Sequence, residues 1–222
     1  MKRTLFITGT DTGVGKTALT ALLTRFLRER GVSAVALKPV CSGGRGDARA
    51  LHAAMNGALT LDEINPWHFR ASIAPSLAAR HEKKPVKLSQ VLAHVRALQK
   101  RFEVVLVEGA GGLLSPLGED FNSRDLITTL RATPIVVAQN KLGAVNHILL
   151  TLEALPKNRR ANARIVLMSP LKPDGPAKTN AKLLAGLTSA EIFPLPRPGK
   201  KSAAAKNLQV RQTLRALAGK VI

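Results

Sequence analysis

The chain has 222 residues, of which 45% are hydrophobic, and this suffices for one large domain with a sizeable core. No stretch approaches the roughly 18 apolar residues that a membrane helix requires, and the apolar run near the start covers only residues 5–7, too short for a signal peptide. A single cysteine, Cys41, excludes an internal disulfide framework. We therefore expect a cytoplasmic protein without a membrane partner, folded as one domain over residues 1–222.

The charge balance is strongly basic, with 34 Lys and Arg against 14 Asp and Glu and a net charge of +20. Residues 156–222 alone hold 14 basic and two acidic residues. Such a field attracts phosphates, nucleic acid or an anionic surface, whereas the alternative is a solvated basic surface without a partner. Aromatic residues make up only 3% of the chain, so no base-stacking platform is predicted. We expect no dedicated nucleic-acid partner and, at most, weak binding of polyanions.

Short apolar runs alternate along the chain with segments of helical periodicity. The segment CSGGRGD (41–47) contains three glycines and is predicted to be only a loop, and PRPGKKSAAAK (196–206) is typical of a mobile loop. The predicted elements, in chain order, are a strand at 3–8, a helix at 15–30, a strand at 34–37, helices at 47–55 and 88–101, strands at 102–107 and 133–139, a helix at 143–155, strands at 164–168 and 192–193, and a helix at 207–218.

This alternation predicts the fold class. Near-continuous apolar strands separated by helices are typical of an α/β protein with a doubly wound, mainly parallel sheet, helices on both faces and the architecture of P-loop NTPases. Crossovers should be right-handed, and a ligand should bind at the carboxyl ends of the strands. Because the glycine-rich loops follow predicted strands, we expect them to gather at that edge of the sheet.

The segment GTDTGVGKT (9–17) stands between the first predicted strand and helix, the context that a P-loop requires. Its backbone N–H groups can point into one concavity, to which the helix N-terminus adds positive charge. Lys16 would reach the β- and γ-phosphates and the Thr17 hydroxyl would ligate Mg²⁺. The strict motif has glycine at Thr10, and a glycine-rich turn that binds nothing is the alternative. The predicted nucleotide-binding residues of this loop are Gly13, Val14, Gly15, Lys16 and Thr17.

Other polar residues follow predicted strands and would reach the same edge. Glu108 stands where the second acidic ligand of a P-loop site belongs, although an ordinary loop acid is the alternative. Asp47 could supply a further Mg²⁺ ligand, or cap the helix that follows it. Lys38 could neutralise a transferring phosphoryl group, while Ser42 beside it is either a ligand or a turn residue.

The start of the predicted helix at 143–155 offers free N–H groups that could hold a carboxylate, although simple capping explains Asn146 equally well. The five histidines have no metal-ligand spacing, which argues against zinc. Ser115 and Cys41 have no nearby base, and no GxSxG elbow is present, so a nucleophilic triad is not predicted. The candidate carboxylate-binding residues are Gly143, Ala144, Val145 and Asn146.

Seven sequence features occur in order over the first two-thirds of the chain: GTDTGVGKT (9–17), KPVCSG (38–43), Asp47, NP (65–66), EGAGG (108–112), PL (116–117) and KLGAVNH (141–147). Together they resemble dethiobiotin synthetase. The resemblance implies ATP-dependent carboxylation and ring closure of 7,8-diaminononanoate with CO₂, through a carbamate and a carbamoyl-phosphate anhydride, to give dethiobiotin, ADP and phosphate. This chemistry needs charge clamps and positioning more than a protein nucleophile.

The resemblance also assigns roles to residues. Lys16 and Lys38 would clamp the γ-phosphoryl group and the carbamate, with Thr12 and Ser42 nearby. The helix start at 143–146 would receive the substrate carboxylate across a homodimer interface. Further implied contacts are Mg²⁺ ligation by Thr17, Asp47 and Glu108, nucleotide binding by Gly109, Ala110 and Gly111, and flanking of the base by Ser169, Pro194 and Leu195.

The chain departs from the family pattern at three places. Relatives often carry an acid where this chain has Gly13, and their Ser-Pro pair is Ala74–Pro75 here. Where an Asn commonly reads the adenine, Ser169 is followed by Pro170. The C-terminal third matches poorly throughout.

The alternative function is that of a partition or septum-positioning ATPase, which acts as a nucleotide switch on DNA or a membrane. Such proteins carry a signature lysine at the position of Asp11 and lack KPV and EGAGG in these places. A non-catalytic nucleotide-binding relative is a third possibility.

Overall fold

The computed structural model describes residues 2–170, 174–196 and 208–219. Six strands form one sheet in the order β2-β5-β1-β6-β7-β8, and every pairing between neighbours is parallel. The strands are β1 Arg3–Gly9, β2 Ala34–Leu37, β5 Val104–Glu108, β6 Thr133–Gln139, β7 Arg164–Ser169 and β8 Glu191–Pro196. β2 and β5 are buried at every residue, as expected of parallel strands covered on both faces.

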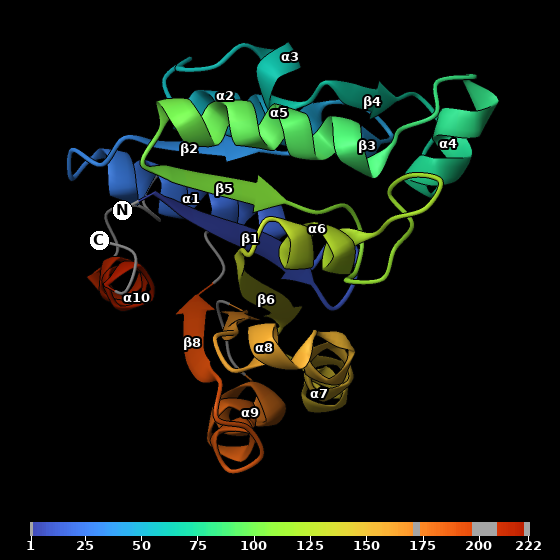
Figure 1. Cartoon of the computed structure of the whole chain (residues 1–222). Helices are drawn as coiled ribbons and strands as arrows, with labels where there is room; N and C mark the ends of the chain where they lie inside the picture. The colour runs from blue at the N-terminus through green and yellow to red at the C-terminus, as the bar shows by residue number, and fades with distance from the viewer. Residues whose placement is uncertain (1, 171–173, 197–207, 220–222) are drawn as a thin grey trace.

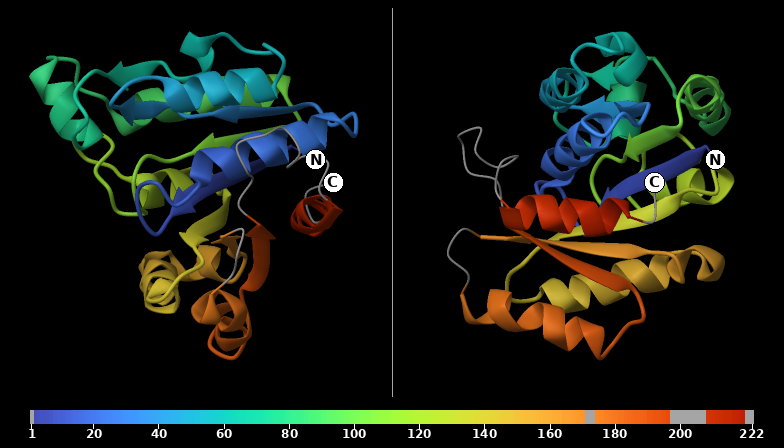
Figure 2. Two further views of the ribbon diagram at one scale, coloured as in Figure 1. Left: turned by 180° about the vertical axis from the view of Figure 1, so that it is seen from behind. Right: turned by 90° about the vertical axis from the view of Figure 1, so that its left-hand side faces the viewer.

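Helices cover both faces of this sheet (Figures 1 and 2). α1 and α2 lie on one face and α5 and α6 on the other, while α10 packs against α1 and β8. The doubly wound parallel sheet predicted from the sequence is therefore confirmed. The helices are α1 Lys16–Arg28, α2 Gly46–Ala54, α3 Leu61–Ile64, α4 Pro75–His81, α5 Leu88–Arg101, α6 Ser123–Thr129, α7 Ala144–Ala154, α8 Lys157–Arg160, α9 Gly175–Ala185 and α10 Leu208–Ala218.

A second, two-stranded sheet corrects the prediction that residues 41–47 form only a loop. β3 (Val40–Ser42) pairs in parallel with β4 (Trp67–Phe69), with Cys41 opposite His68, and Gly46 opens α2. The local composition indicated a loop because it contains three glycines. The pairing with a strand more than twenty residues away is a tertiary effect that local composition does not encode.

Elements outside the predicted set are mostly short. They are β3, β4, α3, α4, α6, α8 and α9. The strand expected at 192–193 extends over Glu191–Pro196 and includes two prolines. They are tolerated because β8 is at the edge of the sheet, where a strand needs hydrogen-bond donors on one side only. The strand expected at 102–107 starts later, since Phe102 terminates α5. Residues 197–206 of the predicted mobile loop lie outside the described residues.

β1, β2 and β5 point their carboxyl ends toward the end of the molecule where α4 lies in Figure 1. The loops after β1, β2 and β5 meet there, because β1 and β2 both pair with β5. In the described part of the chain, no helix combines the length and apolarity needed to cross a bilayer.

Candidate phosphate-binding active site

The loop between β1 and α1 has the backbone of a phosphate cradle. Gly13 and Gly15 adopt φ angles of 71° and 107°, in the left-handed region that favours glycine. A Cβ on Gly15 would also stand 3.0 Å from Cγ of Met168, so β7 packs tightly against this loop. The side-chain amide of Gln139 donates to the Gly13 carbonyl at 3.1 Å and ties the loop to β6. Free N–H groups at the start of α1 complete an anion-binding concavity.

Lys16 begins α1 and lies folded over this loop. Its ammonium donates to the backbone carbonyl of Asp11 at 2.8 Å. Burial and, to a smaller extent, the nearby Lys38 lower the pKa of Lys16 to about 8, although Glu108, Asp47 and Asp11 oppose the shift. The group is thus a desolvated cation whose charge a phosphate would stabilise.

This shifted pKa predicts a pH dependence of nucleotide binding. The phosphates require the ammonium form, so above pH 8 binding must first return a proton to Lys16. Affinity for the Mg²⁺ complex of ATP should be constant near pH 7 and fall by up to about tenfold per pH unit above the pKa. Calorimetry between pH 7 and 9.5, in buffers of different ionisation enthalpy, should detect proton uptake. A Lys16→Arg control stays charged and should lose this dependence, whereas a flat profile for the unmodified chain would contradict the assignment.

A cluster of charged side chains lies beside the loop. The Lys38 ammonium is 2.9 Å from Oε1 of Glu108 and forms a second ion pair with Asp47, and the Thr17 hydroxyl donates to the same Glu108 oxygen at 2.6 Å. The Lys38 and Glu108 side chains are only 7% and 0% exposed. The sheet explains this meeting, because Leu37 and Val107 are partners in adjacent strands.

The pKa shifts in this cluster follow from pairing. Burial alone would lower the pKa of Lys38, but Glu108 and Asp47 outweigh it and raise the pKa above its ordinary value. Burial would likewise raise the pKa of Asp47, yet Lys38 and a hydrogen bond to Thr17 hold it below its usual range. Lys38 and Asp47 are therefore both charged near neutral pH.

The cluster suits Mg²⁺ better than zinc. The second carboxylate oxygen of Glu108, Oε2, is buried without a hydrogen-bond partner among the described residues, and the Thr17 hydroxyl and the Asp47 carboxylate lie beside the same cluster. Mg²⁺ uses one or two carboxylates and completes its shell with phosphate and water. The described residues contain no group of three or more His, Cys, Asp and Glu that could form a dedicated protein cage. The residues present thus fit Mg²⁺.

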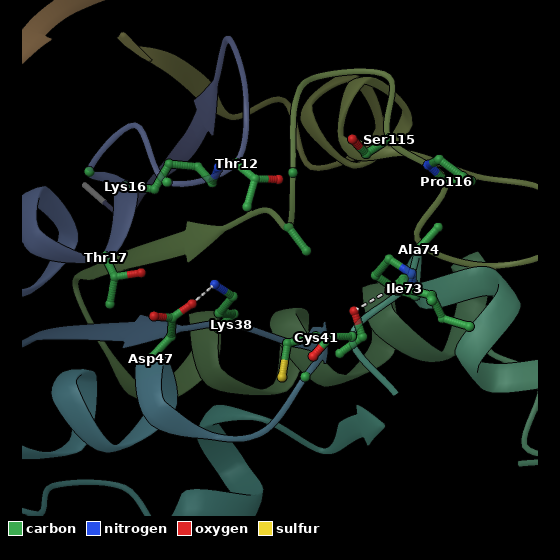
Figure 3. Close-up of a pocket in the computed structure, with 18 of the residues that line it drawn as sticks. Thr12, Lys16, Thr17, Lys38, Cys41, Asp47, Ile73, Ala74, Ser115 and Pro116 are labelled. Carbon is green, nitrogen blue, oxygen red and sulfur yellow. Dashed lines mark hydrogen bonds and ion pairs between the residues drawn. The ribbon is translucent and has the colours of Figure 1, made fainter. Parts of the chain in front are cut away.

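Thr17, Lys38 and Asp47 border one cavity of about 740 Å³, whereas Glu108 is buried and does not line it. Figure 3 shows Lys16, Thr17, Lys38 and Asp47 toward one side of the cavity and Ile73, Ala74 and Pro116 toward the other. This volume lies within the range of small-molecule sites. The predicted residues that line it are Thr12, Gly13, Gly15, Lys16, Thr17, Lys38, Ser42, Asp47, Ala110 and Gly111.

No side chain in this cavity is set up as a nucleophile. Burial raises the pKa of the Cys41 thiol, which donates to the Gly44 carbonyl at 3.3 Å and contacts Oδ1 of Asn65 at 3.2 Å. The Ser42 hydroxyl donates to the Ile73 carbonyl at 2.5 Å. The arrangement therefore offers cations and hydrogen-bond donors rather than a covalent catalyst.

Two local interpretations from the sequence are wrong. Asp47 does not cap α2, because Arg45 occupies the N-cap position and the Asp47 side chain turns to Lys38. Asn146 does not cap α7 either, since Gly143 is the N-cap and no side chain caps this helix. Val14 and Gly109 are buried, and a Cβ on Gly109 would meet the Ser123 hydroxyl at 2.5 Å, so both can offer only backbone groups.

Two predicted groups lie outside the cavity. Gly143, Ala144, Val145 and Asn146 start α7 and do not line it. Ser169, Pro194 and Leu195 lie near the carboxyl ends of β7 and β8, where Ser169 is buried and accepts a hydrogen bond from the Asn140 amide at 2.9 Å. The Leu195 side chain is 0% exposed, so it can touch a base only through its backbone.

The sequence also missed part of the cavity wall. Ser72 and Ile73 line it, yet no motif marks them. Ala74 and Pro75 also line the cavity, at the place where the family has a Ser-Pro pair. That difference was the sequence feature that could have indicated this wall.

Known proteins resemble this chain over most of its length. The family described as an AAA domain matches residues 3–199. An ATP-dependent dethiobiotin synthetase from Anaeromyxobacter sp. (strain Fw109-5) is 46% identical over 179 residues, which cover 79% of this chain and 80% of the relative. Another, from Akkermansia muciniphila, is 39% identical over 193 residues, covering 86% and 90%. The chain belongs to the dethiobiotin synthetase family.

Solved structures of lower identity share the fold. The MinC:MinD cell division protein complex of Aquifex aeolicus has a TM-score of 0.62 at 16% identity, covering 99% of this chain and 97% of that chain. Cobyrinic acid a,c-diamide synthase of Mycobacterium smegmatis with a bound ATP analog and magnesium has a TM-score of 0.60 at 16% identity, covering 100% and 94%. At this identity the likeness to MinD shows the fold alone and does not favour the alternative of a switch ATPase.

Proposed function

We propose that this chain carboxylates 7,8-diaminononanoate with CO₂ and closes the ureido ring at the expense of ATP, giving dethiobiotin, ADP and phosphate. The observation that carries the proposal is the placement of two buried ammonium groups, Lys16 and Lys38, beside a phosphate-binding loop and an adjoining cavity. Membership of the dethiobiotin synthetase family supports the same reaction.

The reaction proceeds in three balanced steps. One amine of the substrate adds to CO₂ and loses a proton, which gives a carbamate. A carbamate oxygen then attacks the γ-phosphorus, and the bond to ADP breaks. Finally the second amine attacks the carbamoyl carbon, loses a proton and expels phosphate as the C–O bond breaks, closing the ring. Each step develops negative charge on oxygen, so fixed cations at that position lower the barrier.

The residues of the chain would divide this work. Lys16 would leave the Asp11 carbonyl and turn to the γ-phosphoryl group, while Lys38 would neutralise the carbamate. The Thr12 and Ser42 hydroxyls lie within reach of the same cavity. Mg²⁺ held near Thr17, Asp47 and Glu108 would neutralise the triphosphate. Because Lys38 pairs with both carboxylates, nucleotide binding should loosen those pairs and free its ammonium.

A direct assay tests this function. The purified chain is incubated with diaminononanoate, bicarbonate, ATP and Mg²⁺, and dethiobiotin and ADP are measured. We expect both products in a one-to-one ratio and no ADP formation above background without the diamine. ATP hydrolysis that depends on DNA or lipid vesicles, without dethiobiotin, would support the switch alternative instead.

We further propose that the active form is a homodimer. The start of α7 lies outside the cavity of its own chain, so a second copy could deliver it to the substrate carboxylate. Leu114 and Leu150 border a hollow beside His147, and Leu142 precedes α7; all three leucines are exposed. Exposed apolar side chains that cluster in this way are typical of an interface. The predicted location in the cytoplasm stays a prediction.

The dimer has its own test. Leu150, 61% exposed on α7, is changed to Asp, and we expect sedimentation to show a monomer with a normal fold and little activity. An aspartate buried at the interface would be a desolvated charge without a partner and would oppose association. Leu208→Asp is the control, because Leu208 is 71% exposed on α10, which packs against α1 and β8. An unmodified chain that is a fully active monomer would contradict the proposal.

Base selectivity should be relaxed. The Ser169 hydroxyl already accepts a hydrogen bond from Asn140, and Pro170 lacks a backbone N–H, so neither can match both edges of adenine as an Asn could. Losing one neutral hydrogen bond reduces discrimination by roughly 0.5–1.5 kcal/mol, about two- to twelvefold. We therefore expect CTP or GTP to support turnover within about tenfold of ATP.

The measurement is kcat/KM for the four nucleotides with diaminononanoate and bicarbonate saturating. A preference for ATP above about a thousandfold would exceed what a lone hydroxyl supplies, and would mean that another residue reads the base.

A further inference from the structure

A second large hollow lies at the amino ends of the strands, opposite the phosphate loop. This basin, of about 790 Å³, is bordered by residues that begin β1, β6 and β7 and by one face of α5. β1 runs from the basin to the phosphate loop, and its seven residues place the two about 20 Å apart. The basin is therefore separate from the active-site cavity.

The lining of the basin is basic. Besides its basic residues, the basin is lined by Thr4, Leu5, Gln99, Leu130 and Thr133, and no carboxylate of the described residues lines it. The basic lining residues are Lys2, Arg3, Arg96, Lys100, Arg131 and Arg164. Like charges gathered in a concave surface repel one another, and the focused field attracts anions.

Several of these cations lack a partner. In the described part of the chain, the side chains of Arg96, Lys100 and Arg131 form no hydrogen bond or ion pair. The Lys2 ammonium donates to the Lys100 carbonyl at 2.5 Å and so joins the start of β1 to the end of α5. Arg96 and Lys100 on α5, and Arg131 after α6, thus line the same hollow, and no carboxylate of the described residues pairs with them.

The backbone of Arg131 provides an independent observation. Its φ is +52°, in the left-handed region, directly after the C-cap of α6. Its N–H bonds the Thr128 carbonyl at 3.1 Å, and the N–H of Ala132 bonds Ile127 at 3.0 Å, which closes the helix. Glycine is favoured at such a position, so an arginine there is unfavourable for the fold alone. Lys83 adopts the same conformation after α4, so what is particular to Arg131 is that its turn places the side chain at the basin.

Arg164 forms the floor of the basin at the start of β7. The residue is 7% exposed, and its guanidinium donates to the Leu217 carbonyl at 2.8 Å. Burial lowers the pKa of Arg164; Glu191, its partner on β8, opposes this shift, and Arg3 adds to it. A bound anion would offset the remaining free-energy cost of burying the charged Arg164 guanidinium.

We propose that this basin is a second anion-binding site, which takes a small oligophosphate. Guanidinium groups bind phosphate oxygens in pairs, and several converging arginines match several phosphates. The limited volume of the basin favours a small ligand over an extended nucleic acid, which also finds few aromatic residues to stack on. This site does not depend on the reaction at the phosphate loop.

The probe is inorganic tripolyphosphate, titrated by calorimetry at about 0.15 M salt, where long-range attraction is screened. The unmodified chain should bind two molecules, one of which ATP displaces from the phosphate loop. In the variant Arg96→Gln/Arg131→Gln, the ATP-displaceable site should bind tripolyphosphate as before. The affinity of the basin should be at least tenfold weaker. Lys178→Gln/Lys182→Gln on α9 removes the same charge from exposed lysines and should bind two. A single site in the unmodified chain, or an equal loss in this control, would overturn the proposal.

A single substitution separates binding from folding. Arg131→Gly should weaken tripolyphosphate at the basin by about threefold to tenfold, the range expected for one charge-assisted contact at a surface. Its melting temperature should equal or exceed that of the unmodified chain, since glycine relieves the left-handed backbone. A lower melting temperature with unchanged binding would show a structural role for Arg131 and contradict the site.

Discussion

Lys16→Ala should lower kcat/KM for ring closure by about a thousandfold or more while the chain folds normally. Removing one preorganised charge donor from a desolvated site typically reduces turnover by about 10²–10³-fold, and here an ammonium on the transferring phosphoryl group is lost. The fold should tolerate the change, because Lys16 donates only to a backbone carbonyl in the loop and its charge is desolvated.

Initial rates and thermal unfolding monitored by circular dichroism measure the two effects separately. Lys178→Ala is the matched control, since Lys178 is an exposed lysine on α9. If Lys16→Ala retains near-normal turnover, the assignment of the phosphate loop fails. If it unfolds, the loss of rate carries no information, and Lys16→Met, which keeps the apolar stem, replaces it.

Lys38→Met should abolish turnover and also destabilise the fold. The change removes the cation proposed for the carbamate, and it leaves the buried Glu108 carboxylate with only Thr17 as a partner. Breaking a buried ion pair from one side typically costs about 3–5 kcal/mol, because the remaining charge is not solvated. The pair also sets a pH window. The pKa of Lys38 is higher in the folded chain than in the unfolded chain. Its contribution to the free energy of unfolding is therefore fully present below the pKa of the unfolded chain and is lost as the pH rises through the pKa of the folded chain.

The double variant Lys38→Met/Glu108→Gln distinguishes the two roles. Neutralising both partners removes the buried charge, so most of the free energy of unfolding should return. Turnover should not return, because both the cation and a predicted Mg²⁺ ligand are absent. Urea unfolding and steady-state kinetics on the unmodified chain, on Lys38→Met and on the double variant measure this. Recovery of activity in the double variant would contradict the catalytic role of Lys38.

The sequence was most informative where the chemistry is local. The phosphate loop places its glycines, Lys16 and Thr17 within nine residues, and its backbone geometry follows from those residue types. The central strands are continuous apolar runs, so their burial and parallel pairing were predictable. The meeting of Lys38 and Glu108 also followed, once both were placed at strand ends.

The remaining parts depend on packing between distant segments. β3 was misassigned because its partner, β4, lies beyond two helices, and the wall at Ile73 is set by α4 rather than by a motif. Burial of Leu195 and the hydrogen bond from Asn140 to Ser169 arise from neighbouring strands and helices. Local sequence does not specify which polar side chain a buried hydroxyl will meet.

The fate of the carbon dioxide oxygens tests the proposed reaction most directly. Rapid mixing of the chain with C¹⁸O₂, diaminononanoate, ATP and Mg²⁺, followed by mass spectrometry, measures the label in both products before the CO₂ exchanges with water. If a carbamate oxygen attacks the γ-phosphorus, one labelled oxygen appears in phosphate and one stays in the ureido carbonyl for every ring closed. Unlabelled phosphate, formed at the same rate with or without the diamine, would show that the chain only hydrolyses ATP and would contradict the proposed function.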